Sequence, residues 1–302
     1  MCYFLFLFTV VFVVFIFLIC RKKEKYDTCG GYNLQTINNP ESYKIITSFT
    51  TTPNRIFKTK KTLYSLSHQT YRPDYLLVNI PERFLRTNEE YIIPKFIKRN
   101  KDVKINVLDI DYGPATKLVG AILYIPKEED TWIVVHDDDQ MYLQETIEEY
   151  IKHINIYNNK RIAFSIGGFN LNENNQIERP YKNMSNISFI EGYQTYCVHR
   201  SVFEDDFIPY IKSQLSNKEA FQSDDLIISN YLAMKNIDIK LIYNNNVNFD
   251  KWWECGCELD YGNQEDALKN ISSSSQNDPL GGHFDKYLRV IKYLKEKKQY
   301  YI

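Results

Sequence analysis

The sequence has almost no excess of charge of either sign. Its 37 Lys and Arg residues face 38 Asp and Glu residues, which gives a formal net charge of −1. A protein that attracts nucleic acid through its overall field needs a clear positive excess. The balance therefore excludes nucleic acid as a partner held by bulk electrostatics, and any anion has to be bound locally.

The sequence also lacks the signs of a structural zinc site and of a repeat protein. None of its six cysteines belongs to paired Cys-x-x-Cys motifs, and no segment recurs along the chain, which excludes a solenoid. With 302 residues, 44% of them hydrophobic and 25% charged, the chain is able to bury a core. We therefore expect a folded domain.

A single long hydrophobic run stands at the N-terminus. Residues 2–20, CYFLFLFTVVFVVFIFLIC, contain no charged side chain, and a helix of this length is about long enough to cross a bilayer. A cleaved signal peptide is the alternative, but no basic segment precedes the run and RKKEK follows it. We therefore expect a single-pass membrane anchor at 2–20, a basic and polar stem at 21–42, and one folded domain at 43–302.

Beyond residue 43, short β-rich runs alternate with amphipathic stretches. The pattern predicts strands at 43–49, 75–80, 103–108, 132–136, 162–166, 189–196 and 239–243, and helices at 58–69, 89–98, 116–124, 143–157, 201–215, 223–234 and 284–298. This alternation indicates an α/β fold with a mostly parallel central sheet flanked by helices. In such sheets the ligand site lies beyond the carboxyl ends of the strands.

Three of the predicted strands end in polar segments: Ser48–Arg55 (SFTTTPNR), Asp109–Lys117 (DIDYGPATK) and His136–Gln140 (HDDDQ). We expect these segments to meet at one edge of the sheet. The consecutive carboxylates of Asp137, Asp138 and Asp139 repel one another, so a cation is expected beside them. Oxygen ligands of this kind suit Mg²⁺ or Mn²⁺, and a solvated turn or a helix cap is the alternative.

The segment DYGPATKL adds a tight turn and the predicted start of a helix. A helix N-terminus carries free N–H groups and partial positive charge, and Lys117 adds a full charge. The segment therefore predicts a phosphate site, with an ordinary turn and a surface lysine as the alternative.

Several motifs together resemble one family. In order, ITSFTTTPNRI, SLSHQTYRPDYLLVNIP, DYGPATKL, VVHDDDQMY, EGYQTY and QSDDLIISNYL, spread over residues 44–243, resemble family-2-like glycosyltransferases of the GT-A fold. The resemblance implies a nucleotide-sugar donor, a divalent metal (Mn²⁺ or Mg²⁺), and a glycan, protein or lipid acceptor. It implies donor contacts from Thr50, Thr51, Arg55, Asp111, Lys117, Asp137 and Asp138, and metal ligands at Asp137, Asp139 and His283. Which aspartate of the triplet contacts ribose and which contacts metal stays open.

The resemblance also implies a catalytic base and an acceptor side. An inverting transferase needs a carboxylate on the face opposite the departing diphosphate, and Asp225 is the first candidate, with Asp224 the second. Glu191, Gly192 and Tyr193 would line the acceptor side. The alternative is that Ser223 or Asp224 caps the helix at 223–234 and that Asp225 lies in its first turn.

Other functions remain open at this stage. A nucleotidyltransferase is expected to carry a glycine-rich loop after the first strand, and SFTTTPNR has no glycine. A catalytically inactive, membrane-tethered carbohydrate-binding protein and a metal-dependent phosphohydrolase are further alternatives.

For location, the resemblance implies an endomembrane of the ER or Golgi type with a lumenal domain. The RKKEK cluster after the hydrophobic run instead favours a cytosolic domain, so both orientations stay open.

Overall fold

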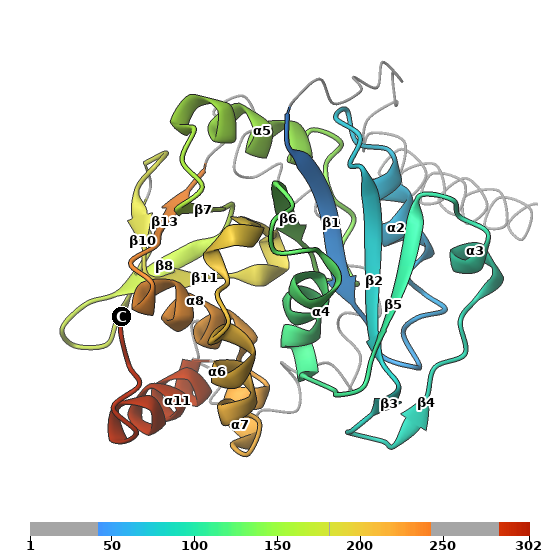
Figure 1. Cartoon of the computed structure of the whole chain (residues 1–302). Coiled ribbons are helices and arrows are strands. Elements are labelled where there is room, and N and C mark those ends of the chain that lie inside the picture. Colours follow the sequence, from blue (N-terminus) through green and yellow to red (C-terminus); the bar gives the residue numbers. More distant parts are fainter. Residues whose placement is uncertain (1–41, 181, 243–283) are drawn as a thin grey trace, which may run out of the picture. The chain divides into compact units, whose positions relative to one another are not determined.

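The computed structural model describes residues 42–180, 182–242 and 284–302 (Figure 1). These residues belong to one compact unit that spans Thr36–Ile302. The predicted anchor at 2–20 and all but the last residue of the predicted stem lie outside the described residues. Among the helices that are described, none is long and apolar enough to cross a membrane.

The centre of this unit is an eight-stranded, mostly parallel sheet with the order β10-β13-β7-β12-β6-β1-β2-β5. Only β12 and β10 run against the other strands. The prediction of a mostly parallel α/β sheet is therefore confirmed. The strands are β1 (Lys44–Thr50), β2 (Tyr75–Pro81), β5 (Val103–Leu108), β6 (Thr131–Val135), β7 (Ile162–Ser165), β10 (Asn186–Ile187), β12 (Tyr196–His199) and β13 (Asp238–Leu241).

Helices cover both faces of the sheet (Figure 1). They are α2 (Lys60–Ser67), α3 (Lys95–Lys98), α4 (Thr116–Tyr124), α5 (Thr146–Tyr157), α6 (Phe207–Gln214), α7 (Lys218–Phe221), α8 (Asp224–Met234) and α11 (Phe284–Glu296). Short strands form a hairpin, β3 (Arg83–Phe84) with β4 (Glu89–Glu90), and a small sheet of β8 (Gly168–Leu171), β9 (Ile177–Glu178) and β11 (Phe189–Ile190).

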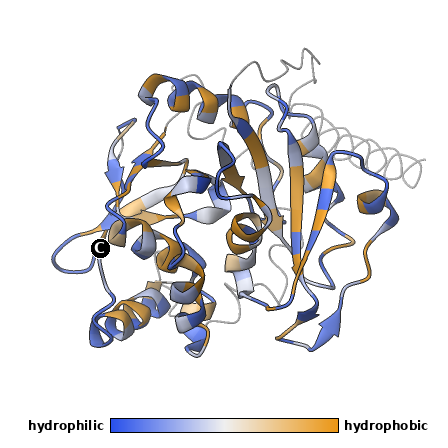
Figure 2. Cartoon of the chain, in the orientation of Figure 1, coloured by the Kyte–Doolittle hydropathy of each residue, from blue (hydrophilic) through white to orange (hydrophobic). Residues whose placement is uncertain are grey.

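Alternation along the strands separates the core into layers. Ile46 and Ile133 pack on one face with residues of α4, α8 and α11, whereas Ile45 and Val134 pack on the other face with α5. Figure 2 shows hydrophobic residues along these central strands and a hydrophilic β3–β4 hairpin. Both faces of the central strands are buried, as is typical of a parallel sheet, and the polar side chains of Thr47, Ser48 and Asn79 are buried with them.

The predicted helix at 89–98 is wrong for its first half. Glu89–Glu90 forms strand β4, and the helix is only α3, which begins after Pro94. Proline has no N–H to donate inside a helix and disfavours helical backbone in the residue before it. Pro94 therefore starts this helix and does not lie within it.

A buried seam of polar side chains fixes α4 on the sheet. Asn79 Nδ2 donates to Ser48 Oγ at 2.8 Å, and Ser48 Oγ donates to the carbonyl oxygen of Lys117 at 2.5 Å. From the next strand, Asn106 Nδ2 donates to Asn79 Oδ1 at 2.9 Å and to the carbonyl oxygen of Gly120 at 3.0 Å. The seam sets the position of the helix that carries Lys117.

Replacing Gly120 with Ala is expected to destabilise the protein by roughly 1–3 kcal/mol. An added Cβ would lie 2.2 Å from Asn79 Oδ1, and Asn79 is fully buried and hydrogen-bonded. In an isolated helix, replacing Gly with Ala stabilises the helix by about 1 kcal/mol. The expected effect on the stability of this protein therefore has the opposite sign. Thermal unfolding measures this; a rise in Tm would show that the seam gives way without cost.

Candidate functional site

The polar segments meet where the strand order reverses. The chain continues from β1 to β2 and β5 on one side, and then returns to β6 on the other side of β1. A crevice opens at such a switch point, beyond the carboxyl ends of the two strands. The segment Thr51–Arg55 follows β1, and Asp137–Asp139 follow β6. The predicted meeting of these segments at one edge is therefore observed.

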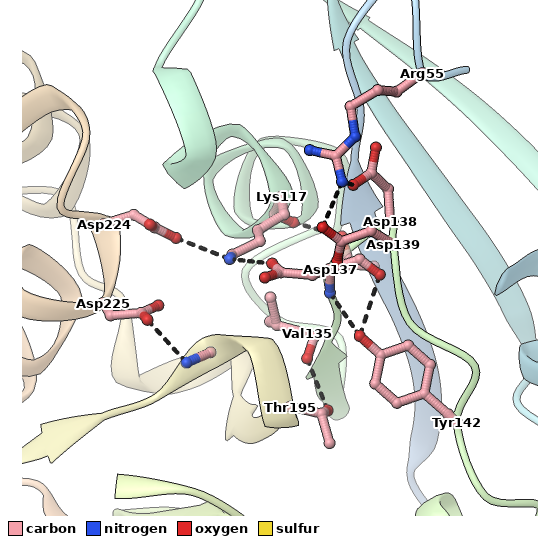
Figure 3. A network of polar contacts seen from close by, with 12 residues as sticks. Arg55, Lys117, Val135, Asp137, Asp138, Asp139, Tyr142, Thr195, Asp224 and Asp225 are labelled. Carbon is pink, nitrogen blue, oxygen red and sulfur yellow. Dashed lines mark hydrogen bonds and ion pairs between the residues drawn. The ribbon is translucent and has the colours of Figure 1, made fainter. Parts of the chain in front are cut away.

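The cations beside the acidic triplet are side chains of the protein itself (Figure 3). Arg55 Nη2 lies 2.7 Å from Asp138 Oδ1 and also pairs with Asp139. Lys117 Nζ lies 2.7 Å from Asp137 Oδ1. The triplet is neither a solvated turn nor a cap, because its carboxylates are paired and α5 begins only at Thr146.

Lys117 connects the triplet to the second pair of aspartates. Its side chain is only 4% exposed, and its Nζ also lies 3.0 Å from Asp224 Oδ2. Burial lowers the pKa of Lys117, but the charges of Asp137, Asp224 and Asp225 outweigh this and raise the pKa well above its usual value. A permanently charged ammonium group therefore lies between the two acidic segments, and the alternative of a surface lysine is wrong.

Asp138 is the most enclosed carboxylate of the triplet. Thr51 Oγ1 donates to its Oδ2 at 2.5 Å, and Thr62 Oγ1 donates to its backbone carbonyl oxygen at 2.6 Å. Burial raises the pKa of Asp138 to about 7, although Arg55 acts in the opposite direction. Asp138 therefore anchors the triplet, while the side chains of Asp137 and Asp139 are 31% and 17% exposed.

His136 points to the opposite face of the sheet from Asp137, because successive side chains along a strand alternate between the two faces. It is fully buried and packs edge-on against Tyr142, with ring centroids 4.4 Å apart. Burial lowers its pKa to about 3, so the ring is neutral. Tyr142 Oη in turn accepts from the backbone N–H of Asp137 at 2.8 Å, which holds the start of the triplet in place.

Asp224 and Asp225 open helix α8 opposite the triplet. Ser223 does not cap this helix with its side chain, because its hydroxyl donates to the carbonyl oxygen of Glu219 at 2.7 Å. The backbone N–H of Gly192 donates to Asp225 Oδ2 at 2.8 Å, while Asp225 Oδ1 is buried without a hydrogen-bond partner among the described residues. Burial, followed by the charge of Asp224, raises the pKa of Asp225 to about 8.

Gly192 is required by this contact. A Cβ on Gly192 would lie 2.4 Å from Asp225 Oδ1. The predicted strand at 189–196 is wrong here, because Gly192–Gln194 forms a turn of 3-10 helix and Thr195 has a φ of 85°. That conformation is rare for a β-branched residue, and the turn aims the amide of Gly192 at Asp225.

The other predicted site residues lie around this centre. Thr50 Oγ1 donates to the carbonyl oxygen of Asn79 at 2.8 Å. Both carboxylate oxygens of Asp111 accept backbone N–H groups, from Leu85 at 2.9 Å and from Gly113 at 2.7 Å. Asp111 thus ties the β3–β4 hairpin to the GPATKL turn. His283 lies outside the described residues.

On the predicted acceptor side, Glu191 forms an ion pair with Arg179, with 2.6 Å between Oε2 and Nη1. Gln194 Nε2 donates to Tyr193 Oη at 2.6 Å. Glu191 and Tyr193 flank Gly192 in the sequence. The sequence predicted that this segment lies at the site. It did not predict the contact between the Gly192 N–H and Asp225, because every residue except proline has a backbone N–H and residue type therefore does not reveal which one donates.

The carboxylates fit a divalent cation by charge and by ligand type. Asp137, Asp138, Asp139, Asp224 and Asp225 surround the two cations Arg55 and Lys117. Within the described ranges, no group of three or more His, Cys, Asp or Glu side chains is already arranged to hold a metal ion. Mg²⁺ is often held by one or two carboxylates together with substrate phosphates, and Asp137 and Asp139 are the two more exposed carboxylates of the triplet.

Fold and site together define an α/β protein with a charged centre at the switch point of its sheet. No protein-family model matches the chain, and none of the curated proteins matches it. Among solved structures, it is similar to S. aureus TarS 1-349, at 13% identity and a TM-score of 0.42, covering 68% of this chain and 59% of that one.

Two further solved structures are similar at the same low level. A mannosyltransferase, PcManGT from Pyrobaculum calidifontis in complex with GDP-Man and Mn²⁺, has 11% identity and a TM-score of 0.39, covering 76% of this chain and 62% of that one. A 4-diphosphocytidyl-2C-methyl-D-erythritol synthase has 11% identity and a TM-score of 0.38, covering 71% of this chain and 100% of that one. The chain thus spans less than two thirds of the first two proteins, and its function has to be argued from its own residues.

Proposed function

We propose that this protein is a metal-dependent, inverting glycosyltransferase that moves a sugar from a nucleotide-sugar donor to an acceptor hydroxyl. The observation that carries the proposal is the placement of Asp225. Its carboxylate is fixed by the Gly192 amide and keeps one oxygen without a hydrogen bond among the described residues. Lys117 pairs with Asp137 of the triplet and with Asp224, the neighbour of Asp225 in the chain. This arrangement supports a base on one side of the ammonium group and a diphosphate on the other.

The chemistry follows from this arrangement. Asp225 accepts the proton of the acceptor hydroxyl, and the oxygen uses the freed electron pair to bond to the anomeric carbon. The bond from that carbon to the diphosphate oxygen breaks, and its electron pair leaves with the nucleoside diphosphate. Because attack and departure occur on opposite faces, the anomeric configuration is inverted.

The cations stabilise the leaving group. Lys117 remains protonated because three aspartates surround it, and a fixed positive charge in a buried site stabilises the negative charge that develops on a diphosphate. When bound, a divalent ion held by Asp137 and Asp139 would neutralise further charge on the phosphates. Arg55 holds Asp138 and Asp139 in position before a donor arrives.

Binding of a nucleotide sugar is expected to require metal and Asp139. The full chain in detergent is screened by thermal shift with UDP-, GDP- and CMP-sugars, with and without Mn²⁺. One nucleotide class should raise Tm only with metal, since a ligand at 100-fold excess over Kd stabilises by about 2.7 kcal/mol, and Asp139→Ala should abolish the rise. Asp205→Ala is the matched control, because the side chain of Asp205 is 94% exposed.

The same screen, extended to free sugars and combined with an assay of donor breakdown, separates the alternatives. A shift with free sugars that needs no metal and survives Asp139→Ala would point to a carbohydrate-binding protein without turnover. Release of phosphate or of free sugar without any acceptor would point to a hydrolase. The absence of a shift with every nucleotide, in a sample with a cooperative unfolding transition, would sink the transferase proposal.

A further inference from the structure

Tyr196 is a buried tyrosine at the centre of the site that the chemistry above does not use. It is the first residue of β12, is fully buried, and lies directly beside Val135 of β6. Residues paired across two strands point to the same face, and so do residues two apart along a strand. Tyr196 and Val135 share one core cluster with Leu226 and Ile227 of α8. Tyr196 therefore lies on the face where Asp137 and α8 meet.

The hydroxyl of Tyr196 has no hydrogen-bond partner among the described residues, and neither does Asp225 Oδ1. Asp224 Oδ2, by contrast, lies 3.0 Å from Lys117 Nζ. Burial is the main cause of the raised pKa of Tyr196, and the charges of Lys117, Asp224, Asp225 and Asp137 also act on it. The hydroxyl thus lies among the same charged groups that form the site. A buried phenol without a partner costs stability, and its position among these charged groups suits a polar ligand or a water molecule.

The two unpartnered oxygens, Tyr196 Oη and Asp225 Oδ1, are complementary to an alcohol. The raised pKa keeps the phenol protonated, so Tyr196 is able to donate a hydrogen bond and is not a base. Once Asp225 is ionised, its Oδ1 is an acceptor. An alcohol accepts with its oxygen and donates with its proton, and therefore satisfies both kinds of group at once.

We propose that the hydroxyl of Tyr196 binds the acceptor alcohol and orients it toward Asp225. In this arrangement, which builds on the glycosyltransferase function proposed above, Tyr196 donates to the alcohol oxygen, and the alcohol proton points to Asp225 Oδ1. A second lone pair of the oxygen remains free to attack the anomeric carbon. A buried water molecule presents the same chemistry, and the experiment distinguishes it from the acceptor.

The test compares Tyr196→Phe with Tyr293→Phe. Tyr293, on α11, also has a buried hydroxyl without a partner among the described residues, and its change removes the same group elsewhere. With the donor identified, we expect Tyr196→Phe to lower kcat/KM for the acceptor about ten-fold, with the Kd for the donor unchanged and Tm equal to or above that of the wild type. Tyr293→Phe is expected to transfer sugar at the wild-type rate.

Two outcomes would overturn the inference. A Tyr196→Phe variant that transfers sugar like an active wild type shows that the hydroxyl contributes nothing to acceptor binding. A variant with lowered Tm and unchanged kcat/KM shows that the hydroxyl instead binds a structural water molecule. A wild-type chain that transfers no sugar removes this inference together with the proposed function, so the two failures are distinguishable.

Discussion

Replacing Asp225 with Asn is expected to lower the rate of sugar transfer about 10²–10⁴-fold while the protein stays folded. An amide oxygen still accepts the N–H of Gly192, which lies 2.8 Å from the present carboxylate, but an amide does not take a proton from the acceptor. Single-turnover transfer measured with saturating donor isolates this step from donor binding.

Asp224→Asn serves as the comparison for Asp225→Asn. Asp224 precedes Asp225 in the sequence, and its Oδ2 lies 3.0 Å from Lys117 Nζ. Removing its charge should therefore affect the ion pair with Lys117 and leave the proton transfer to Asp225 in place. If Asp224→Asn abolishes transfer and Asp225→Asn retains it, the base is Asp224 and the assignment made here is wrong.

The raised pKa of Asp225 predicts how the activity and the stability of the wild type depend on pH. Transfer needs the ionised carboxylate, so kcat/KM of the wild type should rise with pH until it levels off above about 8. Stability should change in the opposite direction. In the folded protein Asp225 keeps its proton up to about pH 8, whereas an unfolded Asp loses it at about pH 3.9. The contribution of Asp225 to the free energy of unfolding is therefore complete below about pH 3.9 and is lost as the pH rises through about 8.

Asp138 contributes in the same direction, because burial raises its pKa to about 7. Asp225→Asn should therefore remove only part of the decline of Tm between pH 4 and pH 8, on the order of one proton's share. A Tm profile for the variant that matches the wild type over this whole range would contradict the raised pKa.

Replacing Lys117 with Met is expected to destabilise the protein by roughly 3–5 kcal/mol. The change leaves Asp137 and Asp224 without their shared cation in a site where Lys117 is 4% exposed. Removing one partner from a buried ion pair costs more than the pair contributes, because the remaining charge stays desolvated. Donor binding should also weaken, because Lys117 is the cation proposed to stabilise the diphosphate.

Lys152→Met is the matched control. Lys152 also contacts two carboxylates, Glu148 at 3.1 Å and Glu149 at 2.8 Å, but its side chain is 50% exposed. An exposed pair of this kind contributes about 0–1 kcal/mol. Chemical unfolding of both variants tests the difference. Equal losses for the two lysines would show that burial of Lys117 does not set its importance.

The course of the chain through the fold was readable from the sequence wherever one physical signal dominated. The short β-rich runs of β1, β2, β5 and β6 and the amphipathic stretches between them predicted a parallel sheet, because strands that alternate with helices are joined by crossover connections. The polar ends of these strands predicted the edge where the site lies, because parallel strands end on the same side.

The errors fall where competing local preferences meet. The segment Phe189–Tyr196 has the β-rich composition of a strand, yet Gly192–Gln194 turns and Thr195 takes a φ of 85°. The hydroxyl of Thr195 donates to the carbonyl oxygen of Val135 at 2.7 Å, which helps to hold this conformation (Figure 3). Such strain persists only when surrounding contacts impose it, and those contacts come from residues distant in sequence.

By itself, the sequence determined the fold class, the edge of the sheet that carries the site, and the acidic segments that meet there. Residue type and periodicity act locally, so these features needed no knowledge of contacts. Only the tertiary structure decided that Arg55 and Lys117 are the cations beside the triplet and that a backbone amide fixes Asp225. It also decided that the hydroxyl of Tyr196 is buried without a hydrogen-bond partner among the described residues. Charge pairing, desolvation and hydrogen bonding depend on distances between residues far apart in the chain, and folding alone sets those distances.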